Sequence, residues 1–172
     1  MKKIILIAAM VFGFTFAVSA QQKSVGVRFG VMEGAVYQHY IGSDNFLEAD
    51  FGYNVPGGRL DISGVYNFMI ARPNWTAQGE WGFYAGPGVT LGTGFTKWNS
   101  FAFGVTGQVG LEYTFWFPLQ LSVDLRPTIG IACGQKVSYV PGAMVPTYTG
   151  SVRFDIAGLY GFIPSISARY TF

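Results

Sequence analysis

The chain has 172 residues, of which half are hydrophobic, 17% are aromatic and 12% are charged. Soluble domains have roughly 25% charged residues, so this chain is unusually apolar, and its many aromatic residues exclude a disordered protein. A single cysteine, Cys133, cannot pair within the chain, and a formal net charge of +2 without a basic cluster excludes nucleic acid as a partner.

Residues 1–20 form the first predicted element, a secretory signal peptide. Met1–Lys3 is a short basic head, Ile4–Val18 is almost wholly apolar, and Ser19-Ala20 ends the segment with small residues, which is the three-part pattern of such peptides. Cleavage leaves residues 21–172, with nine basic and nine acidic residues because two lysines are removed. We expect an exported protein with one mature domain and no formal net charge.

After the signal peptide, the charge-free runs are too short for membrane helices. The longest are Trp81–Thr96 and Val137–Val152, of 16 residues each, and both contain glycine and proline. A spanning helix needs about 20 predominantly apolar residues. We therefore exclude helical membrane spans.

Apolar and polar residues alternate with a period of two in eight segments of the mature chain. Such alternation predicts strands with one apolar and one polar face. In chain order the segments are Val25–Val31, Leu47–Tyr53, Leu60–Phe68, Trp81–Leu91, Phe101–Phe115, Leu119–Leu125, Val152–Ile156 and Ile166–Phe172.

Twelve charged residues lie on the polar faces of these segments, and none lies on an apolar face. They are Arg28, Glu48, Asp50, Arg59, Asp61, Glu80, Glu112, Asp124, Arg126, Arg153, Asp155 and Arg169. Enclosed charges need nearby partners, and arginine–carboxylate hydrogen bonds are strong. We predict that these residues form a charge network in the lumen of a barrel. Met69, Tyr84 and Gln108 help to fill that lumen.

Two all-β architectures produce this alternation, and three features favour a membrane barrel over a soluble one. The polar faces contain mostly Gly, Ser, Thr and Gln rather than many Lys and Glu. Aromatic residues gather at strand ends, as the girdles of an outer-membrane barrel do. A lipid-exposed sheet must also close, which an even number of strands permits. We predict a closed antiparallel transmembrane up-and-down β-barrel of about eight strands.

The predicted connections fit this barrel imperfectly. Short connections are expected at the second, fourth and sixth positions if both termini are periplasmic, but the short ones here are the second, fifth and seventh. Either a boundary is wrong, with further strand hidden in residues 131–151, or the loop asymmetry is weak. Pro87 also cannot donate to a ladder, which predicts a bulge at Gly86–Gly88.

The C-terminal segment Ser165–Phe172 resembles the signal that the outer-membrane barrel-assembly machinery reads. Gly110–Phe115 followed by Pro118–Asp124, and Tyr37–Tyr40 ahead of Asn45–Glu48, resemble small outer-membrane β-barrel proteins of the OmpX/OmpW-like type. The resemblance implies a location in the outer membrane of a Gram-negative cell, outer-membrane lipid as a partner, and no transferable catalytic residue. It assigns the assembly signal to Ile166, Ala168, Tyr170 and Phe172.

Few residues suggest chemistry. His39 is the single histidine, and with Ser43 and Asp44 it could form a nucleophile, base and orienter, but it is more simply a polar residue at the membrane boundary. Glu48 and Asp50 are better explained by the charge network than by an ion site. Cys133 is expected to be buried and inert. We predict no catalytic, cofactor-binding or metal-binding residues.

These observations predict a monomeric, non-enzymatic outer-membrane protein with a structural, envelope or surface-interaction role. Three alternatives remain open: a lipid-modifying outer-membrane enzyme that uses His39, a soluble periplasmic barrel that binds a hydrophobic ligand, and a narrow channel. Eight strands leave an interior that side chains fill or that holds one small ligand, which argues against a large pore.

Overall fold

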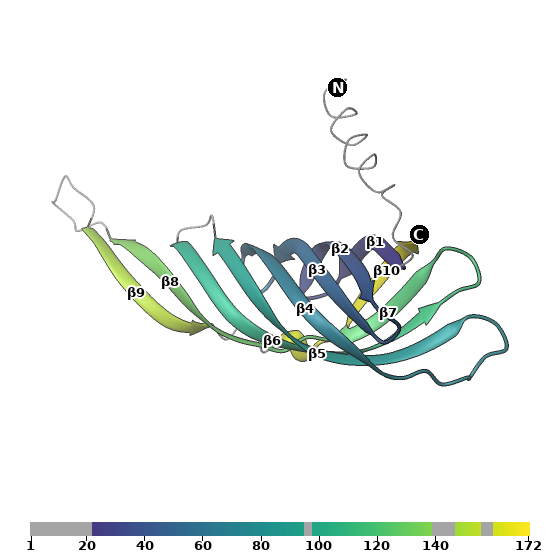
Figure 1. Ribbon diagram of the computed structural model, residues 1–172. Helices are drawn as coiled ribbons and strands as arrows, with labels where there is room; N and C mark the ends of the chain where they lie inside the picture. The colour runs from purple at the N-terminus through teal and green to yellow at the C-terminus, as the bar shows by residue number, and fades with distance from the viewer. Residues whose placement is uncertain (1–21, 95–97, 139–146, 156–159) are drawn as a thin grey trace, which may run out of the picture.

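The computed structural model describes residues 22–94, 98–138, 147–155 and 160–172. The predicted signal peptide lies outside the described residues. Within them, no helix is long and apolar enough to cross a membrane. The strands, drawn in Figure 1, are β1 (Lys23–Phe29), β2 (Met32–Ile41), β3 (Asn45–Asn54), β4 (Arg59–Ala71), β5 (Glu80–Gly94), β6 (Trp98–Thr114), β7 (Gln120–Leu125), β8 (Thr128–Ser138), β9 (Thr147–Asp155) and β10 (Ser165–Thr171).

Eight of these strands close into an antiparallel barrel. β1 pairs with both β2 and β10, and the ladders continue from β2 through β5 and from β10 to β7. β6 closes the ring because it pairs with β5 on one side and with β7 on the other. The predicted all-β, closed barrel of eight strands is therefore confirmed.

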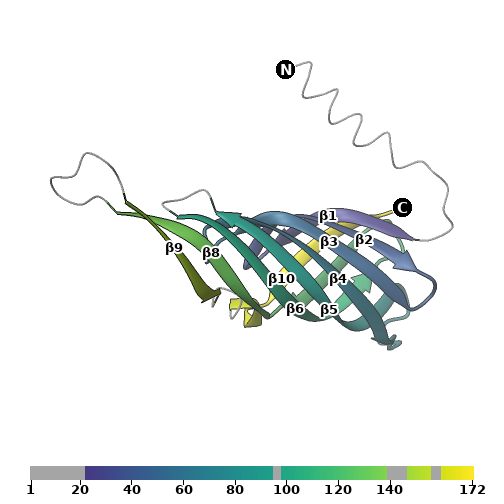
Figure 2. The same cartoon turned by 60° about the vertical axis from the view of Figure 1, so that its left-hand side comes forward.

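β8 and β9 form a hairpin that extends beyond the barrel, as both Figure 1 and Figure 2 show. The first half of β6 pairs with β8, and β9 pairs with β8 and ends the strand order. We call the end of the barrel where β1 begins the terminal end, and the opposite end the far end. The hairpin extends from the far end.

The membership of the ring differs from the prediction in one strand. The alternation predicts no strand between Val25–Val31 and Leu47–Tyr53, but Met32–Ile41 is strand β2. Its inner face contains buried Val36 and Tyr40, while Glu33 points outward, so it lacks the clean apolar-out pattern of its neighbours. The predicted Val152–Ile156 strand is β9 up to Asp155, and it lies outside the closed ring.

With β2 included, residues 42–44, 72–79 and 115–119 join strands at the terminal end, and residues 30–31 and 55–58 join strands at the far end. The connections at the terminal end are not consistently shorter than these two, so the loop asymmetry expected of a barrel with periplasmic termini is not met among them. The hidden strand suspected in residues 131–151 is also present, because β8 covers 128–138 and β9 begins at Thr147.

The bulge expected at Pro87 is wrong. Pro87 stays in register with Gly107 of β6. On its other side the ladder between β4 and β5 runs to Val65 and resumes at Phe68, without a change of register. This interruption accommodates the missing N–H. The register shift in this ladder lies instead between Met69 and Ala71.

Candidate functional site: the interior of the barrel

Polar side chains fill the interior because the strands turn their polar faces inward. β3 shows the pattern most clearly, since its buried and exposed residues alternate from Phe46 to Asn54. Eight of the twelve predicted network residues are buried. They are Arg28, Glu48, Asp50, Arg59, Asp61, Glu112, Asp124 and Arg169.

Glu48, on β3, is the centre of the network. Its Oε1 accepts hydrogen bonds from Nη2 of Arg28 at 2.6 Å and from Nε2 of Gln108 at 2.9 Å. Arg126 Nη2 donates to the same oxygen. The other oxygen, Oε2, accepts from Nη2 of Arg169 at 2.9 Å. One carboxylate thus joins three arginines that come from three regions of the chain.

Asp50 and Asp124 lie beside Glu48 and bind two of its three arginines, Arg28 and Arg126. Asp50 Oδ2 accepts a 2.6 Å hydrogen bond from Arg126 Nη1, and its Oδ1 lies 3.3 Å from Arg28 Nε. Asp124 Oδ2 accepts from Arg28 Nη2 at 3.0 Å. These arginine–carboxylate hydrogen bonds replace contacts that the charged groups would make with water, and they offset part of the cost of burying the charges.

Glu112 is held mainly by neutral donors. Tyr40 Oη donates to its Oε1, and Gln38 Nε2 donates to its Oε2 at 3.2 Å. Its nearest described arginine nitrogen, Nη1 of Arg169, is 3.7 Å away. Tyr40 also packs with Phe46 and Tyr84 in the small aromatic cluster inside the barrel. That cluster begins beside the 42–44 turn, so aromatic rings fill the terminal end.

Sequence reasoning missed the amides that hold Arg169. Arg169 Nη1 donates to Oε1 of Gln38 at 2.9 Å and of Gln120 at 3.1 Å, and Nη2 donates to Ser122 at 2.8 Å. The signal was available for Gln120 and Ser122, because both alternate with Leu121 on a predicted strand. Gln38 was missed because β2 was not predicted.

A second, smaller cluster lies toward the far end. Arg59 Nε donates to Asp61 Oδ1 at 2.7 Å, and Asn54 Nδ2 donates to Asp61 Oδ2 at 2.7 Å. Next to it is a cavity of about 40 Å³, enough for a few water molecules. Residues that line this cavity include Arg28, Val31, Met32, Asp61, Arg126 and Ser165.

The four remaining predicted network residues differ in their positions. The prediction that Glu80 lies in the lumen is wrong. Its side chain is 74% exposed and pairs with Arg72 at 3.4 Å, because the first residue of β5 lies past the rim of the barrel. The side chains of Arg153 and Asp155 lie outside the described part of the chain. Arg126 itself is only 10% exposed and belongs to the network.

His39 does not meet its proposed partners. It lies on β2 opposite Lys23 and Leu47, and its Nδ1 has no hydrogen-bond partner among the described residues. Ser43 Oγ donates to Asp44 Oδ2 at 3.0 Å rather than to the imidazole. The described residues also contain no group of three or more His, Cys, Asp or Glu side chains that could hold a metal ion.

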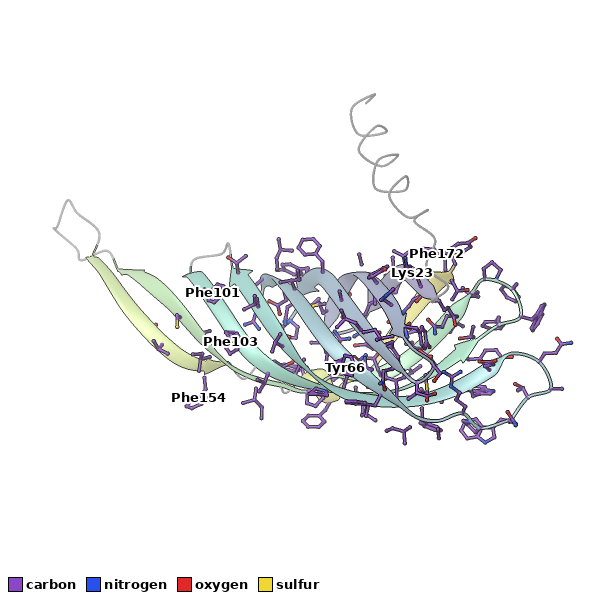
Figure 3. All side chains as sticks on the ribbon, viewed as in Figure 1. Lys23, Tyr66, Phe101, Phe103, Phe154 and Phe172 are labelled. Atoms are coloured by element: carbon purple, nitrogen blue, oxygen red, sulfur yellow. The ribbon has the colours of Figure 1, made fainter. Side chains whose placement is uncertain are left out.

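The outer face is apolar. Phe101 and Phe103 project from β6 and Phe154 projects from β9, as labelled in Figure 3, and all three are exposed. The prediction that Cys133 is buried is wrong, because Cys133 lies on this outer face and is exposed. It shares the exposed side of β8 with Ile131.

Aromatic rings form a continuous cluster at the terminal end of the outer face. Trp75 contacts Trp81, Trp81 contacts Tyr113, and Tyr113 contacts Phe115, with ring centroids between 4.6 and 5.4 Å apart. The Phe115 ring also contacts the rings of Trp116 and Phe117 in the adjoining turn. This cluster has the composition of an aromatic girdle.

The predicted assembly signal follows the outer side of β10. Ile166, Tyr170 and Phe172 are exposed, and the Tyr170 and Phe172 rings are 6.3 Å apart. Phe172 also extends the ladder between β10 and β1, because its backbone exchanges hydrogen bonds of 2.8 and 3.0 Å with Lys23. Figure 3 shows both residues at the terminal end.

Comparison with known proteins finds no matching family model, no matching curated protein and no matching solved structure. The fold and the interior together define the chain as a closed eight-stranded antiparallel β-barrel with a charged, side-chain-filled lumen. The resemblance to the OmpX/OmpW-like type stays a prediction.

Proposed function

We propose that this chain is an integral outer-membrane β-barrel protein without catalytic activity, which supports the envelope or contacts the surroundings through its ends. The observation that carries the proposal is the reversal of the usual burial pattern. Arg28, Glu48 and Arg169 are buried, whereas Phe103, Val105 and Phe154 are exposed. Hydrocarbon around the barrel makes both arrangements favourable.

A soluble barrel is a poor fit to this pattern. Monomeric soluble proteins rarely expose continuous apolar patches larger than a few hundred Å². Here the outer sides of neighbouring strands β4, β5 and β6 expose Ile62, Leu91 and Phe103 in adjacent register positions. The apolar surface therefore passes from strand to strand around the barrel, as a lipid-facing band requires.

The filled interior supports a structural role rather than transport. Arginine–carboxylate bonds cross the lumen at the level of Glu48, and the Tyr40, Phe46 and Tyr84 rings fill the terminal end. We expect the protein to show no sustained conductance in a planar lipid bilayer. A stable single-channel current would favour the narrow-channel alternative.

We further propose that the barrel-assembly machinery recognises the Ile166, Ala168, Tyr170 and Phe172 side chains during biogenesis. Removal of Phe172 also removes the two backbone hydrogen bonds to Lys23, so a truncation alone would mix two effects. Phe172→Ala keeps the backbone and isolates the loss of the ring. We expect less assembled barrel from Phe172→Ala than from the unchanged chain.

Cell fractionation tests the proposed location directly. The chain is produced with residues 1–20 in a Gram-negative host, and membranes are washed with alkaline carbonate. The proposal predicts that the protein stays in the outer-membrane fraction and that detergent releases it as a folded monomer. Recovery from the periplasm without detergent would overturn the proposal and favour the soluble carrier.

A further inference from the structure

The wall of the barrel is much shorter on one side than on the other. The β1–β2 ladder has six paired positions and the β1–β10 ladder also has six, whereas the β5–β6 ladder has fifteen. We call the outer face of β1 and β2 the short wall and the outer face of β5 and β6 the tall wall.

Polar residues limit the short wall at both ends. On β2, Glu33 points outward at the far end, beside outward-facing Tyr53 of β3. At the terminal end, His39 of β2 pairs with Lys23 of β1. Glu33 lies six residues from His39 and eight from exposed Ile41, the last residue of β2. These spacings correspond to heights of about 16 and about 21 Å at the usual strand rise and tilt.

The tall wall has no such limit at these heights. From Trp81 to Thr93 on β5 and from Phe101 to Tyr113 on β6, none of the outward-facing side chains is charged. Twelve residues separate Phe101 from Tyr113, which corresponds to about 31 Å of height. A lipid-facing apolar band is about 25 Å tall. The tall wall therefore exceeds the band, and the short wall falls below it.

We propose that the bilayer is locally thinned against the short wall, so that β1 and β2 form a lipid-contact surface for a membrane thinner than the one that the tall wall spans. The proposal rests on the membrane location proposed above. A bilayer of full thickness would cover Glu33 with hydrocarbon, and a charge on the lipid face is unfavourable in a depth-dependent way. Compression of the lipid near a short hydrophobic stretch costs only fractions of a kcal/mol per Å.

A thinned bilayer also brings lipid headgroups level with the cavity at the far end. Val31 and Met32 follow β1 at the top of the short wall and line this cavity together with Arg28. The polar interior thus opens at the height where the thinned membrane surface lies.

Nitroxide labels at two positions, each eight residues from the last outward-facing residue at the terminal end of its strand, test the proposal. Glu33 lies eight residues from Ile41 on β2, and Val105 lies eight residues from Tyr113 on β6. Glu33→Cys and Val105→Cys are made in a Cys133→Ser chain, labelled, and reconstituted in phosphatidylcholine vesicles with 18-carbon chains. Collision of each label with oxygen, which concentrates in hydrocarbon, and with a water-soluble nickel chelate then reports its depth.

We expect the label at Val105 to report hydrocarbon and the label at Glu33 to report the polar interface, with a severalfold lower oxygen-to-nickel ratio. Phe29→Cys, opposite Glu33 in register order on β1, is the decisive short-wall variant because it keeps the Glu33 charge that Glu33→Cys removes, and we expect its label to report the polar interface as well. Equal ratios at all three positions would overturn the thinning. A short-wall label shielded from both reagents would also overturn it and indicate a protein neighbour, such as a second copy. A Val105 label in water would instead overturn the membrane location itself.

Discussion

Arg169 donates a 2.9 Å hydrogen bond to Glu48 across 121 residues of sequence. Both side chains are fully buried. The bond joins the last strand of the barrel, β10, to β3, which are not neighbours in the strand order. The interior therefore ties together strands that share no backbone ladder, and Glu48 is the group that most of these ties use.

Glu48→Gln is expected to destabilise the barrel strongly. The substitution removes the carboxylate that Arg28, Arg126 and Arg169 share, and removal of one partner from a buried ion pair costs about 3–5 kcal/mol. Urea unfolding of the protein folded in detergent micelles measures the loss.

Glu80→Gln is the matched control for this experiment. It makes the same chemical change in an exposed ion pair with Arg72, and such surface pairs contribute about 0–1 kcal/mol. Equal losses for the two variants would contradict the central role of Glu48.

We expect an added methyl group to affect the stability of the barrel differently at two glycines of β6. A Cβ at Gly110 would lie 2.5 Å from the Tyr84 ring and 2.8 Å from Asp124 Cβ, whereas a Cβ at Gly107 would meet nothing within 4 Å. Overpacking of a filled interior costs about 1–3 kcal/mol. We therefore expect Gly110→Ala to unfold at lower urea concentration, and Gly107→Ala to match the unchanged protein or exceed it. A Gly110→Ala midpoint equal to that of Gly107→Ala would show that the lumen is loosely packed.

Where the alternation is strict, the sequence alone predicts which face of the sheet each charged side chain occupies. The side of the sheet that Arg28, Glu48 and Asp124 occupy follows from the large apolar residues between them, because a strand has a period of two. Their pairing could not be predicted in this way. Which arginine meets which carboxylate depends on the registers between strands and on the tilt of the barrel, and neither is local.

Errors arose where local pattern and barrel geometry diverge. β2 was missed because Tyr40 is apolar but buried, and Glu33 is charged but outward. Glu80 alternates with the outward-facing residues of β5 as an inward-facing residue should, but it lies past the rim of the barrel. Alternation cannot show where a strand leaves the barrel. Cys133 has the same parity as Ile129 and Ile131, so the period of a strand puts it on their outward face. The prediction missed this because it took the segment for a connection.

His39→Ala is expected to leave the envelope lipids unchanged. Ser43 donates to Asp44, and Arg72 donates a 2.6 Å hydrogen bond to the Ser43 carbonyl, so both proposed partners of His39 have other contacts. Mass spectrometry of lipid acyl chains compares cells that produce the unchanged chain, the variant or neither. An acyl pattern that depends on both the chain and His39 would establish the enzymatic alternative instead.

Val109→Arg is expected to distinguish a lipid-facing wall from a water-facing one. Val109 is exposed on β6 and pairs with Ala85 and Leu125, near the middle of the proposed apolar band. An arginine at the bilayer midplane costs about 2–4 kcal/mol, and one near an interface costs about 0–1 kcal/mol.

Val55→Arg, in the exposed turn at 55–58, provides the interfacial control. Urea unfolding from phosphatidylcholine vesicles should therefore show a loss for Val109→Arg that exceeds the loss for Val55→Arg by about 2 kcal/mol. Water around the barrel would make both substitutions nearly neutral, because surface changes of this kind stay within about 0.5 kcal/mol, and equal midpoints for the two variants would contradict lipid contact at Val109.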